Sequence, residues 1–314
     1  MFNFARGSSY YERFSGFVIS AAIDKYVYVA INRTFVNGYC IKYSKNEYVD
    51  TLDEIKHPLL REALRLSEVP PPLEVISIAD VPAGTGLGSS GAFLVGLLHA
   101  LYSHKRQLVS AEKLARDAVE IEINRLGEPI GKQDHYIAAY GGVTCQEYHT
   151  DGSVTVYPLR ISDQTNRELH ENLMMFFTGY NRNASDILND QKVRSELGNS
   201  EMLENLHSIK DLGFQIKAVL ENGDTQAFGE MMHEHWHHKM KRSTGISNSR
   251  INDAYDHGRL HGAIGGKLVG AGGGGFLLFY TRDRMRLRRA MAEIGMPEMP
   301  FRLDFDGSVM LLRG

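Results

Sequence analysis

The stretch Pro82-Ala-Gly-Thr-Gly-Leu-Gly-Ser-Ser-Gly91 decides how this sequence is interpreted. Its alternate glycines Gly84, Gly86 and Gly88 carry no side chains, so backbone N–H groups can approach an anion closely. A nearly continuous apolar run follows at once and predicts a buried helix over Ala92–Leu101. A helix N-terminus has unpaired N–H groups and a partial positive charge. The stretch therefore predicts a binding site for a di- or triphosphate.

Two familiar glycine motifs do not fit this loop. A Walker A loop needs a lysine after its last glycine, and a dinucleotide fingerprint needs GxGxxG inside a βαβ unit. The remaining alternative is a strand-to-helix turn without a ligand. Ser89 and Ser90 disfavour that alternative, because their hydroxyls can bind phosphate or ligate Mg²⁺.

The chain has 314 residues, more than one hydrophobic core usually supports. We therefore predict two domains, residues 1–165 and 166–314, with a hinge in the polar stretch Ile161–Glu171. The expected order mixes strands and helices without regular alternation, which favours an α+β fold. The predicted strands are Phe17–Ile31, Tyr39–Tyr43 paired with it, Leu73–Ala79, Val154–Leu159, Leu173–Thr178, Gly266–Val269, Gly275–Tyr280 and Phe301–Asp306. The other predicted helices are His57–Ser67, Ser110–Leu126, Gln133–Gly141, Ser185–Ser195, Glu201–Asn222, Asp224–Lys241 and Asp283–Ile294.

Composition narrows the class of protein. A net charge of −3 with scattered basic residues gives no field for nucleic acid. The two cysteines, Cys40 and Cys145, form no CxxC pair, which favours a reducing compartment without disulfides or a thiolate zinc site. No signal peptide is visible, and no apolar run reaches the ~18 residues that span a membrane. We expect a cytoplasmic protein.

Two acidic residues could act on a phosphoryl group. Leu114, Ala118 and Glu122 share one helix face, so Glu122 lies on an apolar stripe. A buried carboxylate needs a partner, which Mg²⁺ would provide, and pairing with Arg125 is the alternative. Asp134, in Gly131-Lys132-Gln133-Asp134, could be a helix cap, or it could accept a proton during phosphoryl transfer.

A histidine-rich helix offers a rival interpretation. His233-Glu234-His235-Trp236-His237 satisfies the HExxH pattern of zinc peptidases, with His257 or His261 as a third ligand. A five-residue pattern arises easily in such a tract, and a peptidase leaves both glycine loops unexplained. A polar helix face with Trp236 packed in the core, or a contact with substrate, is favoured.

Together these motifs resemble the GHMP kinases. The loop Pro82–Gly91 resembles their second signature, and Lys267–Phe276 resembles their third. Within the family the chain is most similar to the kinases of D-glycero-D-manno-heptose 7-phosphate. The stretches that carry this similarity are Ile23–Tyr26, Gly127–Asp134, Phe177–Gly179, His233–Trp236 with Lys239, and Gly245–Asn248.

The resemblance implies two α+β domains, a site in the cleft between them, and ATP and Mg²⁺ as cofactors. It implies that Ser90 and Glu122 hold Mg²⁺ and that Asp134 is the base, with Lys132 beside it. The reaction would move the γ-phosphoryl group of ATP to the anomeric hydroxyl of heptose 7-phosphate, for GDP-heptose and surface polysaccharide synthesis. The implied phosphate-binding residues are Pro82, Gly84, Gly86, Leu87, Gly88, Ser89, Ser90, Gly272, Gly273 and Gly274. Candidate contacts to the sugar phosphate are Asp24, Arg182, Ser185, His235 and Lys239.

The sequence departs from the pattern of these kinases at one place. They usually begin with a strand that leads into Gly-Gly-Gly-Thr-Asp, and Ala5-Arg6-Gly7-Ser8-Ser9 stands there instead. A catalytically impaired kinase fold that acts as a binding protein is therefore one alternative, although Ser90, Glu122 and Asp134 are all present. Another GHMP sugar kinase, for fucose or galactose, is the second. The expected partners are ATP and a small sugar phosphate, without nucleic acid or membrane.

Overall fold

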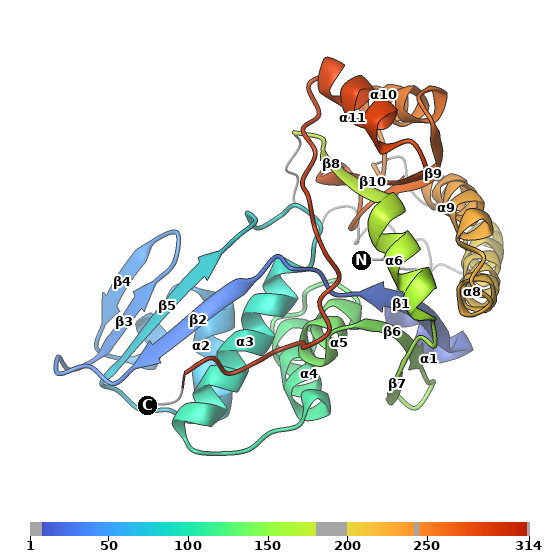
Figure 1. The fold of residues 1–314 in the computed structure, drawn as a ribbon. Helices are drawn as coiled ribbons and strands as arrows, with labels where there is room; N and C mark the ends of the chain where they lie inside the picture. The colour runs from blue at the N-terminus through green and yellow to red at the C-terminus, as the bar shows by residue number, and fades with distance from the viewer. Residues whose placement is uncertain (1–7, 180–199, 242–244, 313–314) are drawn as a thin grey trace.

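The computed structural model describes residues 8–179, 200–241 and 245–312 (Figure 1). Within these residues the strands form three sheets. The first contains β1 (Gly16–Ala21), β6 (Val143–Tyr148) and β7 (Val154–Pro158). The second contains β2 (Val27–Asn32), β5 (Leu73–Ala79), β3 (Tyr39–Lys42) and β4 (Asn46–Val49), in that order. The third contains β8 (Leu173–Phe177), β10 (Phe276–Thr281) and β9 (Ala263–Leu268). Mixed sheets and helices confirm the predicted α+β class.

Helices cover these sheets in two groups. In the first half α3 packs on β2, and α4 packs on α5. In the second half α9 packs on β9, and α8 lies between α9 and β1 (Figure 1). The helices are α1 (Ser8–Phe14), α2 (Pro58–Ser67), α3 (Ser89–His104), α4 (Ala111–Val119), α5 (Gln133–Tyr140), α6 (Asp163–Asn172), α8 (Ser200–Glu221), α9 (Thr225–Met240), α10 (Ser249–Leu260) and α11 (Arg284–Glu293). A short 3₁₀ helix spans Leu52–Glu54, and a π-helical turn spans Glu120–Arg125. None of the described helices combines the length and the apolar character needed to cross a membrane.

The predictions for the first strands are partly wrong. The predicted strand Phe17–Ile31 is two strands, β1 and β2, in different sheets. They separate because Asp24 turns out of the sheet to hydrogen-bond the backbone of Arg302. The predicted strand Tyr39–Tyr43 is β3, which pairs with β4 and β5 rather than with β2. The sequence patterns did not indicate α1, β4, β6 or α10.

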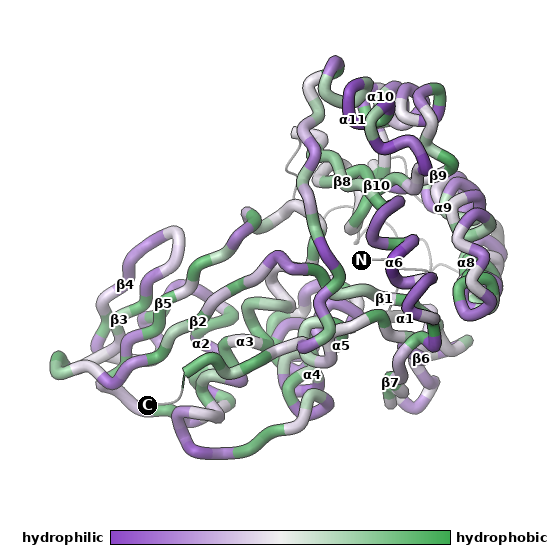
Figure 2. Tube along the Cα trace, viewed as in Figure 1, coloured by the Kyte–Doolittle hydropathy of each residue, from purple (hydrophilic) through white to green (hydrophobic). Residues whose placement is uncertain are grey.

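Most of the predicted hinge Ile161–Glu171 is helix α6, and its role as a hinge stays a prediction. The Ser162 hydroxyl accepts a hydrogen bond from the Thr165 N–H at 3.1 Å and caps the helix. Only Thr165 and Leu169 of this helix are buried, and Figure 2 shows that α6 is hydrophilic along most of its length. The polar composition reflects a solvent-facing helix. The predicted helix Ser185–Ser195 lies outside the described residues.

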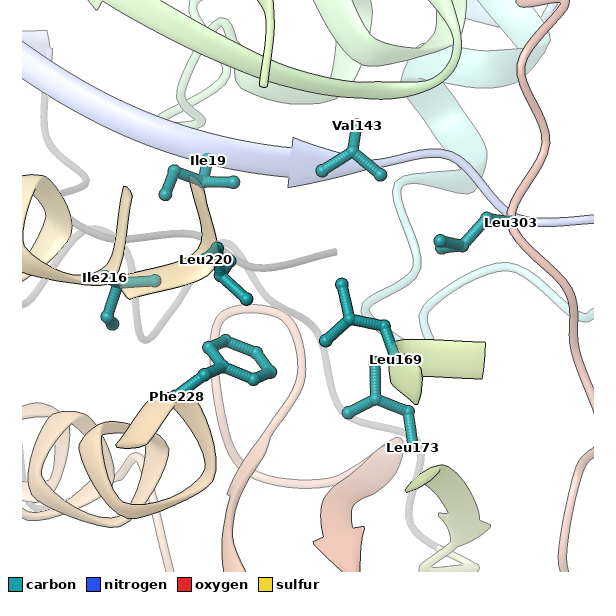
Figure 3. A pocket seen from close by; sticks show the side chains of 8 residues that line it. All are labelled: Ile19, Val143, Leu169, Leu173, Ile216, Leu220, Phe228 and Leu303. Carbon is teal, nitrogen blue, oxygen red and sulfur yellow. The ribbon is translucent and has the colours of Figure 1, made fainter. Parts of the chain in front are cut away.

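A shared hydrophobic core joins the two halves of the chain. Figure 3 shows apolar side chains from six different elements and from the C-terminal segment converging on one point. They surround a gap of about 10 Å³, at the lower limit for a single water, and its entirely apolar lining keeps it dry. The lining residues are Ile19, Val143, Leu169, Leu173, Ile216, Leu220, Phe228 and Leu303. The proposed boundary at residue 165 therefore lies within a chain whose halves pack together, and it stays a prediction.

The segment after α11, residues 297–312, runs back across the first half (Figure 1). The Asp304 N–H donates to Ala22 O at 3.0 Å, and the Gly142 N–H donates to Asp304 O at 2.7 Å. The predicted strand Phe301–Asp306 is thus an extended segment that makes one bridge, between Ile23 and Leu303. This crossing segment connects β1, β6 and α3.

Helix α2 should make stability depend on pH. Its N-cap His57 accepts a hydrogen bond from the Leu60 N–H at Nδ1 (3.4 Å), and burial lowers the pKa of His57. The unfolded chain then takes up a proton at a higher pH than the folded one, so stability is lost as pH falls from about 6.5. Because asparagine also caps helices, we expect His57→Asn to flatten the dependence. Urea unfolding of the parent and the variant at about pH 7.5 and 5.5 measures the loss of stability between these pH values. An equal loss in the two proteins would contradict the prediction.

Candidate active site

The first glycine loop lies between β5 and α3, as predicted. Gly84, Gly86 and Gly88 have φ of 80°, 83° and 79°, a conformation that other residues adopt only at a cost. Helix α3 begins at Ser89, and its N-cap Gly88 provides no side-chain cap. The first N–H groups of α3 are therefore left for an external acceptor, which suits a bound phosphate.

The second glycine loop, between β9 and β10, packs directly on the first. A Cβ on Gly86 would lie 3.0 Å from the Cα of Gly270. A Cβ on Gly275 would lie only 2.1 Å from the carbonyl oxygen of Thr85. The Thr178 hydroxyl accepts the Gly275 N–H at 3.1 Å and holds the loop to β8. The two loops are thus in backbone contact, which residues with side chains would prevent.

The predicted phosphate ligands of the second loop are partly used within the protein. The Gly273 N–H donates to Ile246 O at 2.9 Å. A Cβ on Gly272 would lie 2.7 Å from the Cα of Ile246, so this glycine allows another close approach. The observed contacts of Gly272 and Gly273 are with protein. Phosphate binding by Gly272, Gly273 and Gly274 stays a prediction.

Asp134 lies against the start of α3. It belongs to the first turn of α5 and is half-buried. A Cβ on Gly91 would lie 3.1–3.2 Å from the backbone and Cβ of Asp134, so the two helices touch at this point. The Gln133 amide donates to Asp134 Oδ1 at 3.2 Å. The structure thus brings the predicted base next to the predicted phosphate loop.

A large groove opens beside this contact. Its volume is about 1550 Å³, above the 300–1,000 Å³ typical of small-ligand pockets. Leu87, Gly88 and Asp134 line it, together with β2, one face of α3 and the crossing segment from Asp304 to Leu312. The two glycine loops come from different halves, but the location of a site in a cleft between the halves stays a prediction.

Glu122 has a protein partner that sequence analysis missed. It lies in the π-helical turn and is 4% exposed, which confirms the predicted burial. Its Oε2 is 2.7 Å from Nε2 of His135, a fully buried side chain. The alternative pairing with Arg125 is wrong, because that guanidinium pairs with Glu120 and Glu62. The signal available in sequence was a histidine directly after Asp134.

The pair Glu122–His135 should be important for stability. In His135→Leu the buried carboxylate loses its hydrogen-bond partner, and we expect unfolding to become easier by on the order of 3 kcal/mol. Glu122→Gln keeps an acceptor for the imidazole and should cost less. Urea denaturation of both variants measures the difference. Equal losses of stability in the two variants would contradict the role of the retained acceptor. A loss below about 1 kcal/mol for His135→Leu would show that the pair is not needed.

Lys132 and Asp24 make contacts that hold the fold. The Lys132 ammonium donates to Gly152 O at 3.1 Å, in the turn between β6 and β7, and lies 5.2 Å from the ring centre of Tyr11. Asp24 Oδ1 accepts the Arg302 N–H at 2.8 Å and lies 3.2 Å from the Lys25 ammonium. The roles predicted for Lys132 in catalysis and for Asp24 in sugar binding stay predictions.

Two of the other sugar-binding candidates lie on α9, and two lie outside the described residues. His235 and Lys239 are both buried. The Lys239 ammonium donates to Leu268 O and Gly270 O, each at 2.7 Å. These hydrogen bonds fix the start of the second glycine loop to α9. Arg182 and Ser185 lie outside the described residues. Substrate contacts by these four residues stay predictions.

The peptidase alternative gains no support from the histidine-rich helix. In the described ranges no group of three or more His, Cys, Asp and Glu side chains is placed to hold a metal ion. Glu234 is 57% exposed and lies 3.7 Å from His238, on the outside of α9. His257 and His261 bind backbone carbonyls instead.

Comparison with known proteins agrees with this geometry. Residues 42–142 match the GHMP kinases N terminal domain, and residues 216–295 match the GHMP kinases C terminal domain. Together the two matches span more than half of the 314 residues. The glycine loops and the two-part fold define an ATP-dependent phosphotransferase. The chain belongs to the GHMP kinase family.

Three known proteins are similar to this chain in sequence or structure. D-glycero-alpha-D-manno-heptose 7-phosphate kinase of Campylobacter jejuni is 29% identical over 285 residues, which cover 87% of this chain and 83% of that protein. The solved structure of a D-glycero-D-manno-heptose 1-phosphate kinase from Bacteroides thetaiotaomicron has a TM-score of 0.79 and 26% identity, covering 96% of this chain and 92% of that one. A bifunctional fucokinase/GDP-fucose pyrophosphorylase of Arabidopsis thaliana is 28% identical over 67% of this chain but 20% of its own length. The predicted similarity to heptose phosphate kinases is confirmed.

Proposed function

We propose that this enzyme transfers the γ-phosphoryl group of ATP to the anomeric hydroxyl of D-glycero-D-manno-heptose 7-phosphate, giving the 1,7-bisphosphate. The observation that supports the chemistry is the close approach of Gly91 to the backbone and Cβ of Asp134, together with the groove that Gly88 and Asp134 both line. The identity of the sugar rests on the similarity to the two heptose phosphate kinases. GDP-heptose synthesis for surface polysaccharides is the corresponding pathway, and the cytoplasm is the corresponding compartment.

In the proposed mechanism the first glycine loop and the start of α3 bind the ATP phosphates. Their N–H groups meet the negative charge at a helix N-terminus. Asp134 accepts the proton of the sugar hydroxyl, and the hydroxyl oxygen bonds to the γ-phosphorus of ATP. The bond between the γ-phosphorus and the bridging oxygen breaks, and ADP leaves with the electron pair. The groove, at about 1550 Å³, has room for both reactants.

We infer that Ser90 and Glu122 would be the protein ligands of Mg²⁺. The Ser90 hydroxyl and the Glu122 carboxylate are oxygen ligands of the kind that this cation prefers, and proteins usually hold it with one or two carboxylates plus substrate phosphates. Glu122 has one oxygen on His135, and this hydrogen bond would orient the carboxylate. A Mg²⁺ ion held there would neutralise negative charge on the phosphates.

A coupled assay of ADP release tests the substrate. We would offer heptose 7-phosphate, heptose 1-phosphate, and free heptose, fucose and galactose, each with ATP and Mg²⁺. The expected result is a kcat/KM for heptose 7-phosphate at least about 100-fold above that for the free sugars, since a site built for a polar group rejects analogues that lack it. Identification of the 1,7-bisphosphate as product fixes the acceptor position.

Two outcomes would replace this proposal. Preferred turnover of free fucose or galactose would assign the chain to another branch of the family. ATP binding without turnover of any sugar would favour the alternative of a catalytically impaired binding protein.

A further inference from the structure

Two histidines on α9 lie outside the proposed reaction. His233 and His237 are one helical turn apart, and their Nε2 atoms are 3.2 Å from each other. Two metal–nitrogen bonds of 2.0–2.1 Å at a tetrahedral angle span about 3.3 Å between the nitrogens. The two imidazoles are therefore already at the separation that one tetrahedral metal ion requires. We propose that His233 and His237 chelate a divalent transition-metal ion, such as Zn²⁺, on the outer face of α9.

A second contact orients the first ligand. His233 Nδ1 is 2.7 Å from the hydroxyl of Tyr255, a buried residue of α10. When Nδ1–H donates to this hydroxyl, Nε2 of His233 carries a lone pair, which accepts the His237 Nε2–H as long as no ion is bound. Hydrogen bonds of this kind fix the tautomer and the ring orientation of metal-binding histidines. The His233 and Tyr255 rings are also stacked, with 3° between their planes. Packing and a hydrogen bond thus hold His233 in place before any ion binds.

The protonation of His233 and the solvent exposure of His237 suit metal binding. Burial is the largest cause that lowers the pKa of His233, which favours its neutral form. Neutral imidazole is the form that binds metals. His237 is exposed, so an ion can reach the pair from solvent. Two imidazoles leave two tetrahedral positions for water.

The same helix spacing elsewhere in the chain provides a contrast. His257 and His261 are also one turn apart, but His257 Nε2 lies 3.1 Å from Ala290 O. His261 Nδ1 lies 2.8 Å from His257 O. The nitrogens that remain are thus Nδ1 of His257 and Nε2 of His261, whereas the first pair meets through two Nε2 atoms. This pair is the control for histidines with the same spacing but different engaged nitrogens.

Calorimetric titration of the untagged full chain with Zn²⁺ at pH 7.5 tests the proposal, in a Cys40→Ser background that removes the partly exposed thiol. We expect one ion per chain. His233→Gln and His237→Gln should each weaken binding by more than about tenfold, and Tyr255→Phe by about tenfold, as for other outer-shell partners. His261→Gln and His238→Gln should bind like the parent.

The exposed position of His237 keeps the test decisive, because His237→Gln should fold normally. Its thermal midpoint without metal should match that of the parent, whereas the rise in midpoint with Zn²⁺ should be lost. Unchanged affinity in both His233→Gln and His237→Gln, or binding that disappears in His261→Gln instead, would overturn the site. Absence of Zn²⁺ binding by the parent would overturn it as well. Because these readouts do not use the kinase reaction, they stand apart from the proposed function.

Discussion

Asp134→Asn is expected to lower kcat by about 10²- to 10⁴-fold, the usual contribution of a general base. The amide has nearly the size of the carboxylate and can still accept the hydrogen bond from Gln133. It cannot take a proton from the sugar hydroxyl. Affinity for ATP should change little, because the phosphate loop stays in place. Steady-state ADP release and equilibrium nucleotide binding, measured on the same preparation, separate the two effects.

A surface variant controls for the loss of one negative charge. Asp253 is exposed on α10, and Asp253→Asn should retain the parent kcat. Urea unfolding should give all three proteins the same midpoint. If Asp134→Asn kept the parent kcat, Asp134 would serve only as an acidic residue in the first turn of α5, and the base would have to be sought elsewhere.

Gly275→Ala is expected to separate the two glycine loops and to cost on the order of 4 kcal/mol of stability. The new methyl group would lie 2.1 Å from Thr85 O, which is backbone and cannot swing aside. The φ of 106° at this position adds strain for any residue with a Cβ. Since proteins of this kind are stable by roughly 5–15 kcal/mol, we also expect low yield and a large fall in kcat. Denaturant unfolding and ADP release measure both losses.

Gly295→Ala provides the matched comparison. Gly295 also has a positive φ, 72°, but a Cβ there would meet no atom within 4 Å. Its cost should be only the backbone strain, about 1–2 kcal/mol. Similar losses in the two variants would mean that close packing of the loops contributes nothing beyond strain.

Sequence alone was sufficient for features that depend on local patterns. The loop Pro82–Gly91 needed glycines in left-handed conformations, and those positions have them. Burial of Glu122 followed from helical spacing. The predicted helix starts at Ser110 and Asp224 are also local, and both residues cap their helices. These features require knowledge of only a few neighbouring residues.

Contacts between residues distant in the chain could not be predicted from local sequence patterns. Nothing local indicates that β5 separates β2 from β3, or that Gly270 meets Gly86. The hydrogen bond between Glu122 and His135 joins two helices across a turn, and a polar stretch such as Ile161–Glu171 reads equally well as hinge or surface helix. Each error came from pairing that tertiary packing decides.

The crossing segment after α11 has a consequence for how the protein is made. Ala22 O and the Gly142 N–H belong to the half that the ribosome produces first, yet both are hydrogen-bonded to Asp304. We expect these groups to stay without their final partners until nearly the whole chain has emerged. Contacts between residues so distant in sequence slow folding, since the chain between them must first be ordered. We therefore expect these hydrogen bonds of Ala22 and Gly142 to form only after the crossing segment has been synthesised.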